Sequence, residues 1–217
     1  MDGGYARSVP RQLPPAETTA VITMEMQRGV VGDLASMPAL AATAAARHPL
    51  ADHGTLVPHA RKHAVPVVHA VVSWRADRRG TSINTPLTAM LAKIPEQILE
   101  GTPAVELVPE LGDTTHDLHS HRNHALTPFT GTDLDAMLRS IGITTVVACG
   151  VSLNVGVLGL CLSASDLGYR VVVCSDAVVG VPVSYGDEVM SNTIAMIAEI
   201  TTTQALVAHW ALEPARA

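Results

Sequence analysis

Runs of β-branched and other apolar residues alternate with segments of helical character, and this alternation constrains the fold most strongly. Strand character is found at 19–25, 64–72, 144–149, 169–175 and 201–203, and helical spacing at 40–63, 86–99, 132–141, 154–167 and 185–200. Continuous Val and Ile runs alternating with helices are typical of a parallel sheet covered on both faces. We therefore expect a three-layer α/β/α sandwich with a mostly parallel, Rossmann-like sheet.

Composition indicates one globular domain. The 217 residues are 47% hydrophobic and 16% charged, enough for a sizeable core. Gly and Pro in 1–16 suggest a flexible arm, which leaves 17–217 as the domain. The net charge of −6 argues against binding to nucleic acid. No signal-peptide core and no apolar run of membrane-spanning length is seen, so we expect a cytoplasmic protein without a membrane partner.

Polar side chains follow the predicted strands where ligands bind in parallel sheets, outside the carboxyl ends. These places are 25–33, 73–84, 150–156 and 176–185. Glu25 is the strongest candidate, because a carboxylate that ends a buried strand must be paired or protonated. A protonated Glu25 would suit general acid catalysis. The alternative is a structural role, in which Glu25 bonds to backbone amides or to the turn at Asn154.

Three sequence stretches carry a family resemblance. They are AVITMEMQ (20–27), FTGTDLDAML (129–138) and GVSLNVGVLGLCLSASDLGYRVVVCSD (150–176). Together with GTPAVELVPEL (101–111), they resemble the isochorismatase-like hydrolases, also called the cysteine hydrolase superfamily, over about 19–208. The resemblance implies an isochorismatase-like fold.

The resemblance also implies where a catalytic triad would lie. Amidases of the family use an Asp, a Lys and a nucleophilic Cys. In this chain those positions fall on Glu25, on Asn123 with Arg122 beside it, and on Gly156, so the chain resembles a divergent member. A glycine cannot attack a carbonyl, so the covalent amidase route is closed at that site. Cys161 lies five residues further along the helix and points about 140° away from Gly156.

The vinyl-ether-hydrolysing members, the isochorismatases proper, resemble this chain in carrying Gly at the nucleophile position. In them an acid near the first strand protonates the enol-ether carbon, and water completes the hydrolysis. Those enzymes retain the lysine and an aspartate. The extra methylene of Glu25 shifts its carboxylate by about 1 Å, a displacement that can cost about 100-fold in rate.

The segment 116–124 holds four histidines in nine residues. It indicates a proton relay, a metal site or a solvated edge strand. Arg122 could hold an anionic substrate with its planar fork but could not move a proton near neutral pH. His124 or His121 could move the proton. We therefore predict Glu25, Arg122 and His124 as the catalytic residues and no metal.

Further residues are predicted to bind substrate. The turn at 150–156 opens a helix, whose free N–H groups suit an oxyanion, and the resemblance implies a cis peptide at Val151–Ser152. Trp74 with nearby arginines suits a planar anion. The alternatives are a tight turn and a solvated loop. The substrate-binding candidates are Gln27, Trp74, Arg79, Asn84, Asn123, Phe129, Ser152, Asn154, Gly156 and Tyr185.

Two functions remain open. The first is cysteine-independent acid catalysis, an enol-ether hydrolysis or related rearrangement, on a small and anionic metabolite. The second is a pseudoenzyme that binds a small molecule or acts as an oligomeric partner. An ordinary amidase would need the missing Cys and Lys. We expect no cofactor, and the resemblance implies a homodimer or homotetramer.

Overall fold

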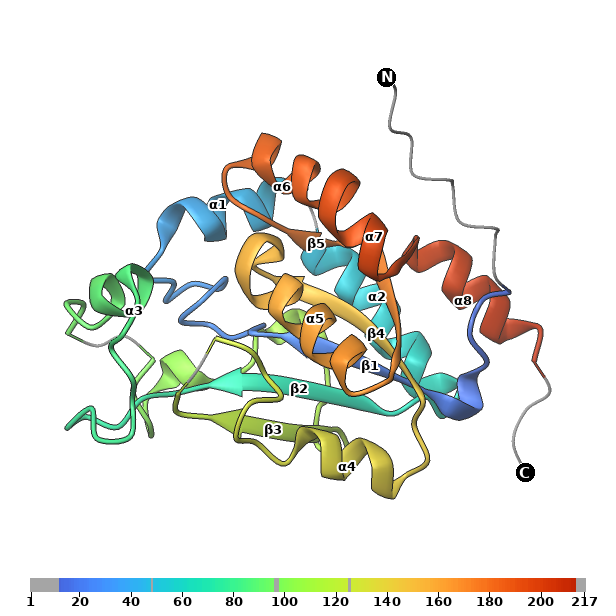
Figure 1. The fold of residues 1–217 in the computed structure, drawn as a ribbon, viewed down its shortest axis with the longest axis horizontal. Helices are drawn as coiled ribbons and strands as arrows, with labels where there is room; N and C mark the ends of the chain where they lie inside the picture. Colours follow the sequence, from blue (N-terminus) through green and yellow to red (C-terminus); the bar gives the residue numbers. More distant parts are fainter. Residues whose placement is uncertain (1–11, 48, 96–97, 125, 214–217) are drawn as a thin grey trace.

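Six parallel strands form one sheet in the order β3-β2-β1-β4-β5-β6 (Figure 1). The computed structural model describes residues 12–47, 49–95, 98–124 and 126–213. This sheet and its flanking helices confirm the predicted α/β/α class. The strands are β1 (Thr19–Met24), β2 (Val67–Val72), β3 (Leu118–Arg122), β4 (Thr145–Val151), β5 (Arg170–Val179) and β6 (Glu199–Thr201).

Helices cover both faces because strand side chains alternate between two cores. Val21 faces one core and Ile22 the other. The first core is covered by α1 (Pro38–Arg47), α2 (Pro49–Lys62) and α8 (Thr203–Ala211). The second core is covered by α4 (Leu134–Ser140), α5 (Leu158–Asp166), α6 (Val183–Val189) and α7 (Ala195–Ile197).

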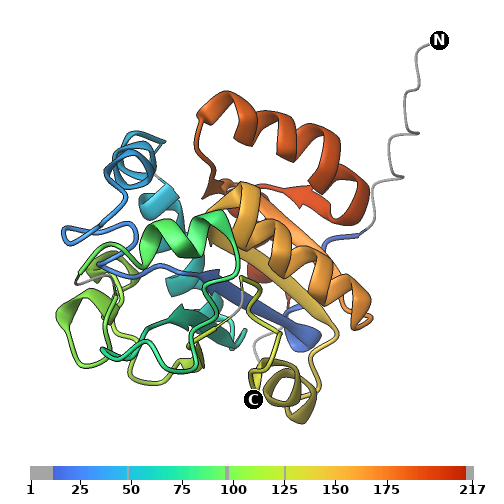
Figure 2. The ribbon, with the colours of Figure 1, turned by 60° about the vertical axis from the view of Figure 1, so that its left-hand side comes forward.

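Shorter turns complete the chain. Three are 3₁₀ turns, η1 (Ala16–Thr18), η2 (Pro103–Val105) and η3 (Pro109–Leu111), and two are π-helical, η4 (Leu153–Val157) and η5 (Met190–Ile194). The helix α3 (Pro86–Leu91) lies beyond the carboxyl ends of the strands, which Figure 2 brings forward. In the described part of the chain, no helix has the length and apolar character needed to span a bilayer.

Several element boundaries differ from the predictions for local reasons. The strand predicted at 64–72 begins only at Val67, because Ala64 adopts a positive φ of 55° and Pro66 follows. The helix predicted over 86–99 ends at Leu91. The helical segment predicted at 40–63 is divided into two helices, with Pro49 at the start of α2 and Pro58 inside α2 without ending it. The helix α8 was not predicted, and Thr202 caps it by accepting a hydrogen bond from the Ala205 N–H.

The predicted arm at 1–16 lies mostly outside the described residues. Its last part packs on α8, because the Trp210 indole donates to the Pro14 carbonyl and the Ala16 N–H donates to Glu213. The strand order reverses direction between β1 and β4. In sheets of this order the crevice at that point is where ligands bind. The fold therefore places the ends of β1 and β4 at a candidate site.

Candidate active site

Glu25 follows β1 directly and leaves the strand in an unusual backbone conformation. Its φ is 53°, in a region that residues other than glycine seldom adopt. The Glu25 N–H donates to the Ala70 carbonyl at 3.0 Å, and the Glu25 carbonyl accepts from the Gln27 N–H at 2.8 Å. Such backbones cluster at functional sites, where the surroundings hold them in place. The turn aims the carboxylate out of the strand, with the side chain 20% exposed.

Arg122 ends β3 and reaches Glu25 from two strands away. It lies in register with Val72 of β2, and its Nη2 donates to Oε1 of Glu25. The Arg122 side chain is only 3% exposed. Its Nε and Nη1 have no hydrogen-bond acceptor among the described residues. A buried guanidinium with two unpaired nitrogens is costly, so this arginine has capacity for a further anion.

The Glu25–Arg122 pair lies in a cavity of about 90 Å³ at the carboxyl end of the sheet. One water needs roughly 10–15 Å³ of such space, so the cavity has room for several waters or a small metabolite. Of the predicted site residues, it brings together Glu25, Trp74, Arg122, His124, Ser152 and Gly156. They come from the ends of four neighbouring strands, β1 to β4.

His124 lies against the glycine of the FTGT stretch. A Cβ built on Gly131 would come within 2.5 Å of Nε2 of His124, and Gly131 has a positive φ of 69°. A larger residue at position 131 would displace the imidazole. Gly131 therefore makes room for His124 at the cavity wall.

Gly156 lies where the chain allows almost no side chain. A Cβ there would lie 2.9 Å from the Val151 carbonyl oxygen and 3.0 Å from Cε of Met24. The methionine could move, but the carbonyl belongs to the turn with the cis peptide at Val151–Ser152. Gly156 therefore contributes space and backbone to the cavity, and no reacting group.

Four predicted binding residues lie outside the cavity lining and contact other parts of the protein instead. Gln27 is fully buried, with its amide donating to the Val72 and Val105 carbonyls and accepting from the Val72 N–H. Asn154 donates to the Val181 carbonyl.

The other two of these four residues also have partners elsewhere. Asn123 donates to Glu100 at 2.6 Å and to the Ser73 carbonyl at 3.3 Å. Phe129 packs in the core against Tyr169, with ring centroids 5.9 Å apart. None of the four lines the cavity in the described part of the chain.

The remaining three candidates are exposed and also lie outside the cavity. Arg79 and Asn84 are on the loop after β2, and Tyr185 is 50% exposed on α6. Their positions after strand ends put them forward, together with the nearby Trp74 in the case of Arg79, and position in a loop does not decide which way a side chain points. The residues that the sequence did not indicate are mostly apolar. They include Val30, Met37 and Leu40 near α1, and Leu87 and Leu91 on α3.

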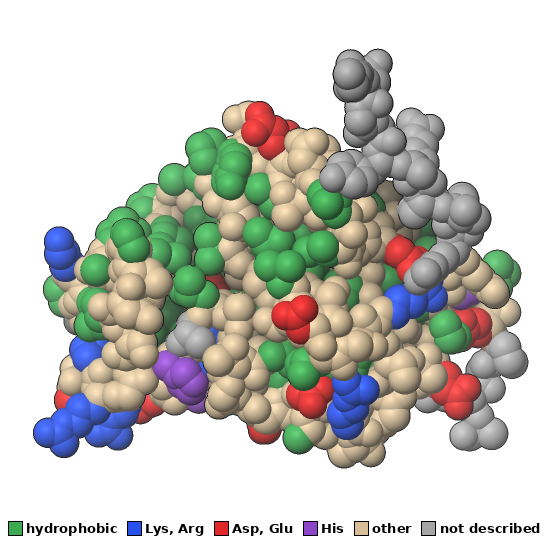
Figure 3. Space-filling view, viewed as in Figure 1, with side chains coloured by type: hydrophobic (Ala, Val, Ile, Leu, Met, Phe, Trp, Pro, Cys, Tyr) green, Lys and Arg blue, Asp and Glu red, His purple; other side chains and the backbone are tan. Residues whose placement is uncertain are grey.

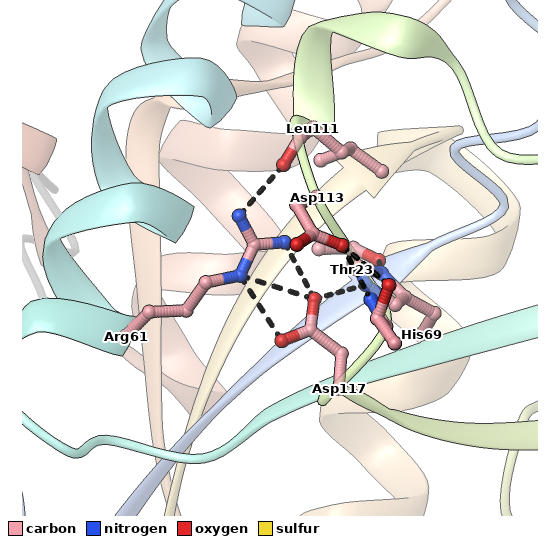
Figure 4. Close-up of polar contacts among 7 residues, drawn as sticks. Thr23, Arg61, His69, Leu111, Asp113 and Asp117 are labelled. Atoms are coloured by element: carbon pink, nitrogen blue, oxygen red, sulfur yellow. Dashed lines mark hydrogen bonds and ion pairs between the residues drawn. The ribbon is translucent and has the colours of Figure 1, made fainter.

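A second cluster of charged side chains lies at the opposite end of β3 (Figure 4). Arg61 donates through Nε and Nη2 to Asp117 and through Nη1 to the Leu111 carbonyl. His69 pairs with Asp117 at 2.8 Å and with Thr23 at 2.7 Å. Burial would raise the pKa of Asp117, but hydrogen bonds from His69 and Arg61 outweigh burial and lower it to about 2.

The other histidines of the 116–124 segment do not gather at the cavity. Burial and the nearby His69 lower the pKa of His119, whose ring lies 5.1 Å from that of His69. His121 pairs with the Ser73 hydroxyl at 2.5 Å. Over the residues that the structure describes, no three His, Cys, Asp or Glu side chains form a group that could hold a metal ion.

Sequence comparison assigns the family. The model of the isochorismatase domain matches residues 19–205. The chain belongs to the isochorismatase family. It is 28% identical over 170 residues to the uncharacterized isochorismatase family protein YecD of Escherichia coli O157:H7, covering 75% of this chain and 80% of that protein.

Solved structures of the isochorismatase family share the fold. A cysteine hydrolase from Pseudomonas syringae pv. phaseolicola 1448A superposes with a TM-score of 0.78 at 23% identity, covering 94% of this chain and 98% of that one. An isochorismatase family protein from Burkholderia thailandensis gives 0.74 at 25% identity, covering 92% and 100%.

Because the Pseudomonas syringae neighbour is a cysteine hydrolase, the positions of the cysteines in this chain show whether a thiol lies at the cavity. All three, Cys149, Cys161 and Cys174, lie in the described part of the chain, are fully buried and are absent from the cavity lining. Burial raises the pKa of Cys161 to about 12 and raises those of the other two as well. Since the thiolate is the nucleophile, these groups are chemically inert.

Proposed function

We propose that this protein catalyses a cysteine-independent, acid-assisted reaction on a small anionic metabolite. Hydrolysis of an enol ether is the reaction that fits best, and a related rearrangement is the alternative within the same chemistry. The observation that carries the proposal is the Glu25–Arg122 pair in the cavity, with two Arg122 nitrogens lacking acceptors. A carboxyl group that can move a proton thus lies beside a cation that can hold an anion.

The roles of the two residues follow from their chemistry. An anionic group of the substrate would take the unpaired N–H groups of Arg122 and bring a second negative charge toward Glu25. Two negative charges beside one guanidinium repel each other, and this repulsion favours uptake of a proton by one of the two groups. Glu25 would then act as the general acid, and Arg122 would orient the substrate.

Water is the only co-reactant that the step needs. Glu25 gives its proton to the carbon of the enol double bond, which leaves an oxocarbenium ion. Water adds to that ion and loses one proton, and the resulting hemiketal hydroxyl passes its proton to the leaving oxygen as the C–O bond breaks, so that an alcohol and a carbonyl compound leave. His124, which lines the cavity, would take the proton from the water and return one to Glu25.

The thiols support this route over a covalent one. The cavity lining contains no cysteine in the described part of the chain, and Gly156 leaves no room for one without movement of the Val151 carbonyl. A covalent thioester intermediate would need a thiolate within the cavity.

One observation favours a second candidate, a binding protein without turnover. The Glu25 carboxylate already accepts a hydrogen bond from Arg122, which occupies it within the protein. In that case the cavity would bind the anion and no bond would break.

The two candidates are separated by a turnover assay with a panel of small carboxylated enol ethers, followed as release of the carbonyl product. Glu25→Gln keeps the shape of the side chain and removes the acid, so it should abolish turnover. Glu110→Gln is the matched control, because Glu110 is an exposed glutamate outside the cavity. Turnover that survives Glu25→Gln would overturn the acid role. Binding of a panel compound by the wild-type protein without turnover would favour the binding protein.

A further inference from the structure

The walls of the cavity around Glu25 and Arg122 are mostly apolar. Val30 and Met37 lie on one side, Leu87 and Leu91 of α3 on another, and Val155 of η4 on a third. Figure 3 shows hydrophobic side chains gathered over the part of this face where α1 and α3 lie. A ligand that fills such a space replaces water with apolar contacts only if its own body is apolar.

Two of the hydroxyl groups in the lining already have protein partners. The Thr81 hydroxyl donates to the Asn123 carbonyl at 3.0 Å. The Thr88 hydroxyl lies 2.9 Å from that of Thr85 in the capping box that begins α3. These two hydroxyls therefore have little capacity left for hydroxyls of a ligand, and the other hydroxyls of the lining belong to Ser36, Ser82 and Ser152.

Positive charge in the lining is confined to one place. Among the described lining residues, Arg122 alone has a guanidinium or ammonium group. Arg28 is outside the lining and pairs with Asp33 and Glu106. Arg78 is also outside it and lies over the Trp74 ring, 4.6 Å from its centroid. A second anionic group on the ligand would meet no second guanidinium or ammonium group among the described lining residues. Most of the remaining wall is apolar, where an unpaired charge is costly, and only His124 and the hydroxyl and backbone groups of the lining are polar there.

We propose that the substrate carries a single anionic group, bound at Arg122, on a small and apolar body such as an unsaturated ring. A dicarboxylate should bind more weakly than a monocarboxylate, because the described lining offers a single guanidinium group. This inference rests on the proposed function, because it places the anion beside Glu25. It adds the substrate class, which can fail while the acid role of Glu25 stands.

The two tryptophans of the chain allow a direct test. Trp74 lines the cavity, whereas Trp210 belongs to α8 and is fully buried. In a Trp210→Phe protein, fluorescence reports on Trp74 alone. We expect benzoate to change this fluorescence in a saturable way. Benzamide lacks the charge and isophthalate adds a second carboxylate. Each should bind at least about tenfold more weakly than benzoate.

Two variants test whether the preference for benzoate depends on Arg122. Arg122→Gln should remove the preference for benzoate over benzamide, and Arg79→Gln, an exposed arginine outside the cavity, should keep it. If Arg122→Gln does not fold, the comparison of the three compounds in the Trp210→Phe protein still decides. Equal binding of benzamide, equal or tighter binding of isophthalate, or no fluorescence change with any compound at millimolar concentration would each overturn the proposal.

The outcomes also separate this inference from the proposed function. Turnover that depends on Glu25 but is fastest with dicarboxylates would overturn the substrate class and leave acid catalysis standing. A benzoate preference together with turnover unaffected by Glu25→Gln would do the reverse.

Discussion

The strand β3 carries a charged pair at each of its ends, and the two pairs differ in how completely their hydrogen bonds are satisfied. At its amino end, Arg61 uses all three guanidinium nitrogens on Asp117 and Leu111, and His69 completes the cluster. At its carboxyl end, Arg122 uses one nitrogen on Glu25 and leaves two without an acceptor in the described part of the chain. We call the cluster of Arg61, His69 and Asp117 the closed cluster, because each guanidinium nitrogen of Arg61 has an acceptor. We call the Glu25–Arg122 pair with its cavity the open site, because Arg122 has capacity for a ligand.

An arginine–carboxylate pair is therefore not by itself a sign of function. Asp117 is 5% exposed and Arg122 3%, so burial does not distinguish the two ends. The unpaired nitrogens and the adjoining cavity do. A buried donor without an acceptor is rare in folded proteins, and each case requires an explanation.

The largest expected effect lies at the carboxyl end. Glu25→Gln should lower turnover by about 1000-fold, because positioned acid–base groups contribute rate factors of this order. Asp117→Asn, the matching change at the amino end, should leave turnover per folded molecule within about twofold. Steady-state kinetics of the two variants on one substrate measure the contrast. Equal losses in both would remove the distinction between the two ends.

Stability should show the opposite pattern. Asp117→Asn should lower the free energy of unfolding by about 3 kcal/mol, because it leaves Arg61 and His69 without their shared acceptor in a largely buried place. Glu25→Gln should lower it by less, since Glu25 is more exposed and its partner already has unpaired nitrogens. Urea unfolding of both variants tests this order. A larger loss for Glu25→Gln would contradict it.

The pH dependence of stability should report on the closed cluster. The pKa of Asp117 is lowered from 3.8 to about 2, so its contribution is complete above pH 4 to 5 and is lost as the pH falls toward 2. This contribution is about 2 kcal/mol. The difference in unfolding free energy between the wild-type protein and Asp117→Asn should therefore shrink over that window. A difference that stays constant from pH 6 to pH 2 would contradict the account.

A smaller effect tests the role of Gly156, which lines the cavity of the open site. Gly156→Ala should cost about 1–2 kcal/mol of stability, because the new methyl group meets the Val151 carbonyl oxygen. Gly159→Ala on α5 is the control, since its Cβ would meet only the Thr127 side chain, which can turn aside. Thermal unfolding of both variants gives the comparison. Equal stability of the two would show that the backbone at position 156 can relax.

Modification of the cysteines in the native protein is expected to have no effect on activity. Alkylation of the native protein with iodoacetamide should leave its activity unchanged, because all three thiols are buried and protonated. Mass spectrometry of the native and the unfolded protein checks that modification requires unfolding. Inactivation in step with modification of one cysteine would contradict a thiol-independent route.

Features that depend on nearby residues could be predicted from the sequence. The Val and Ile runs predicted the parallel sheet, and the binding of ligands outside the carboxyl ends of parallel strands indicated Glu25. The sequence did not decide which of Arg122, Asn123 and His124 takes the position of the family's lysine, because their directions depend on how β3 pairs with β2. Gln27 and Asn154 looked like binding residues, but their amides bond to backbone from distant segments. The apolar wall from α3 could not be predicted either, since it comes from the path of the loop after β2.

The most direct test of the open site is a crystal structure of the protein soaked with benzoate. The account predicts density for the ring among the apolar walls. The carboxylate should lie within hydrogen-bond distance of the Arg122 guanidinium and beside Glu25. An unchanged cavity, a ring bound without contact between its carboxylate and Arg122, or acceptors from the protein on both unpaired nitrogens would contradict it.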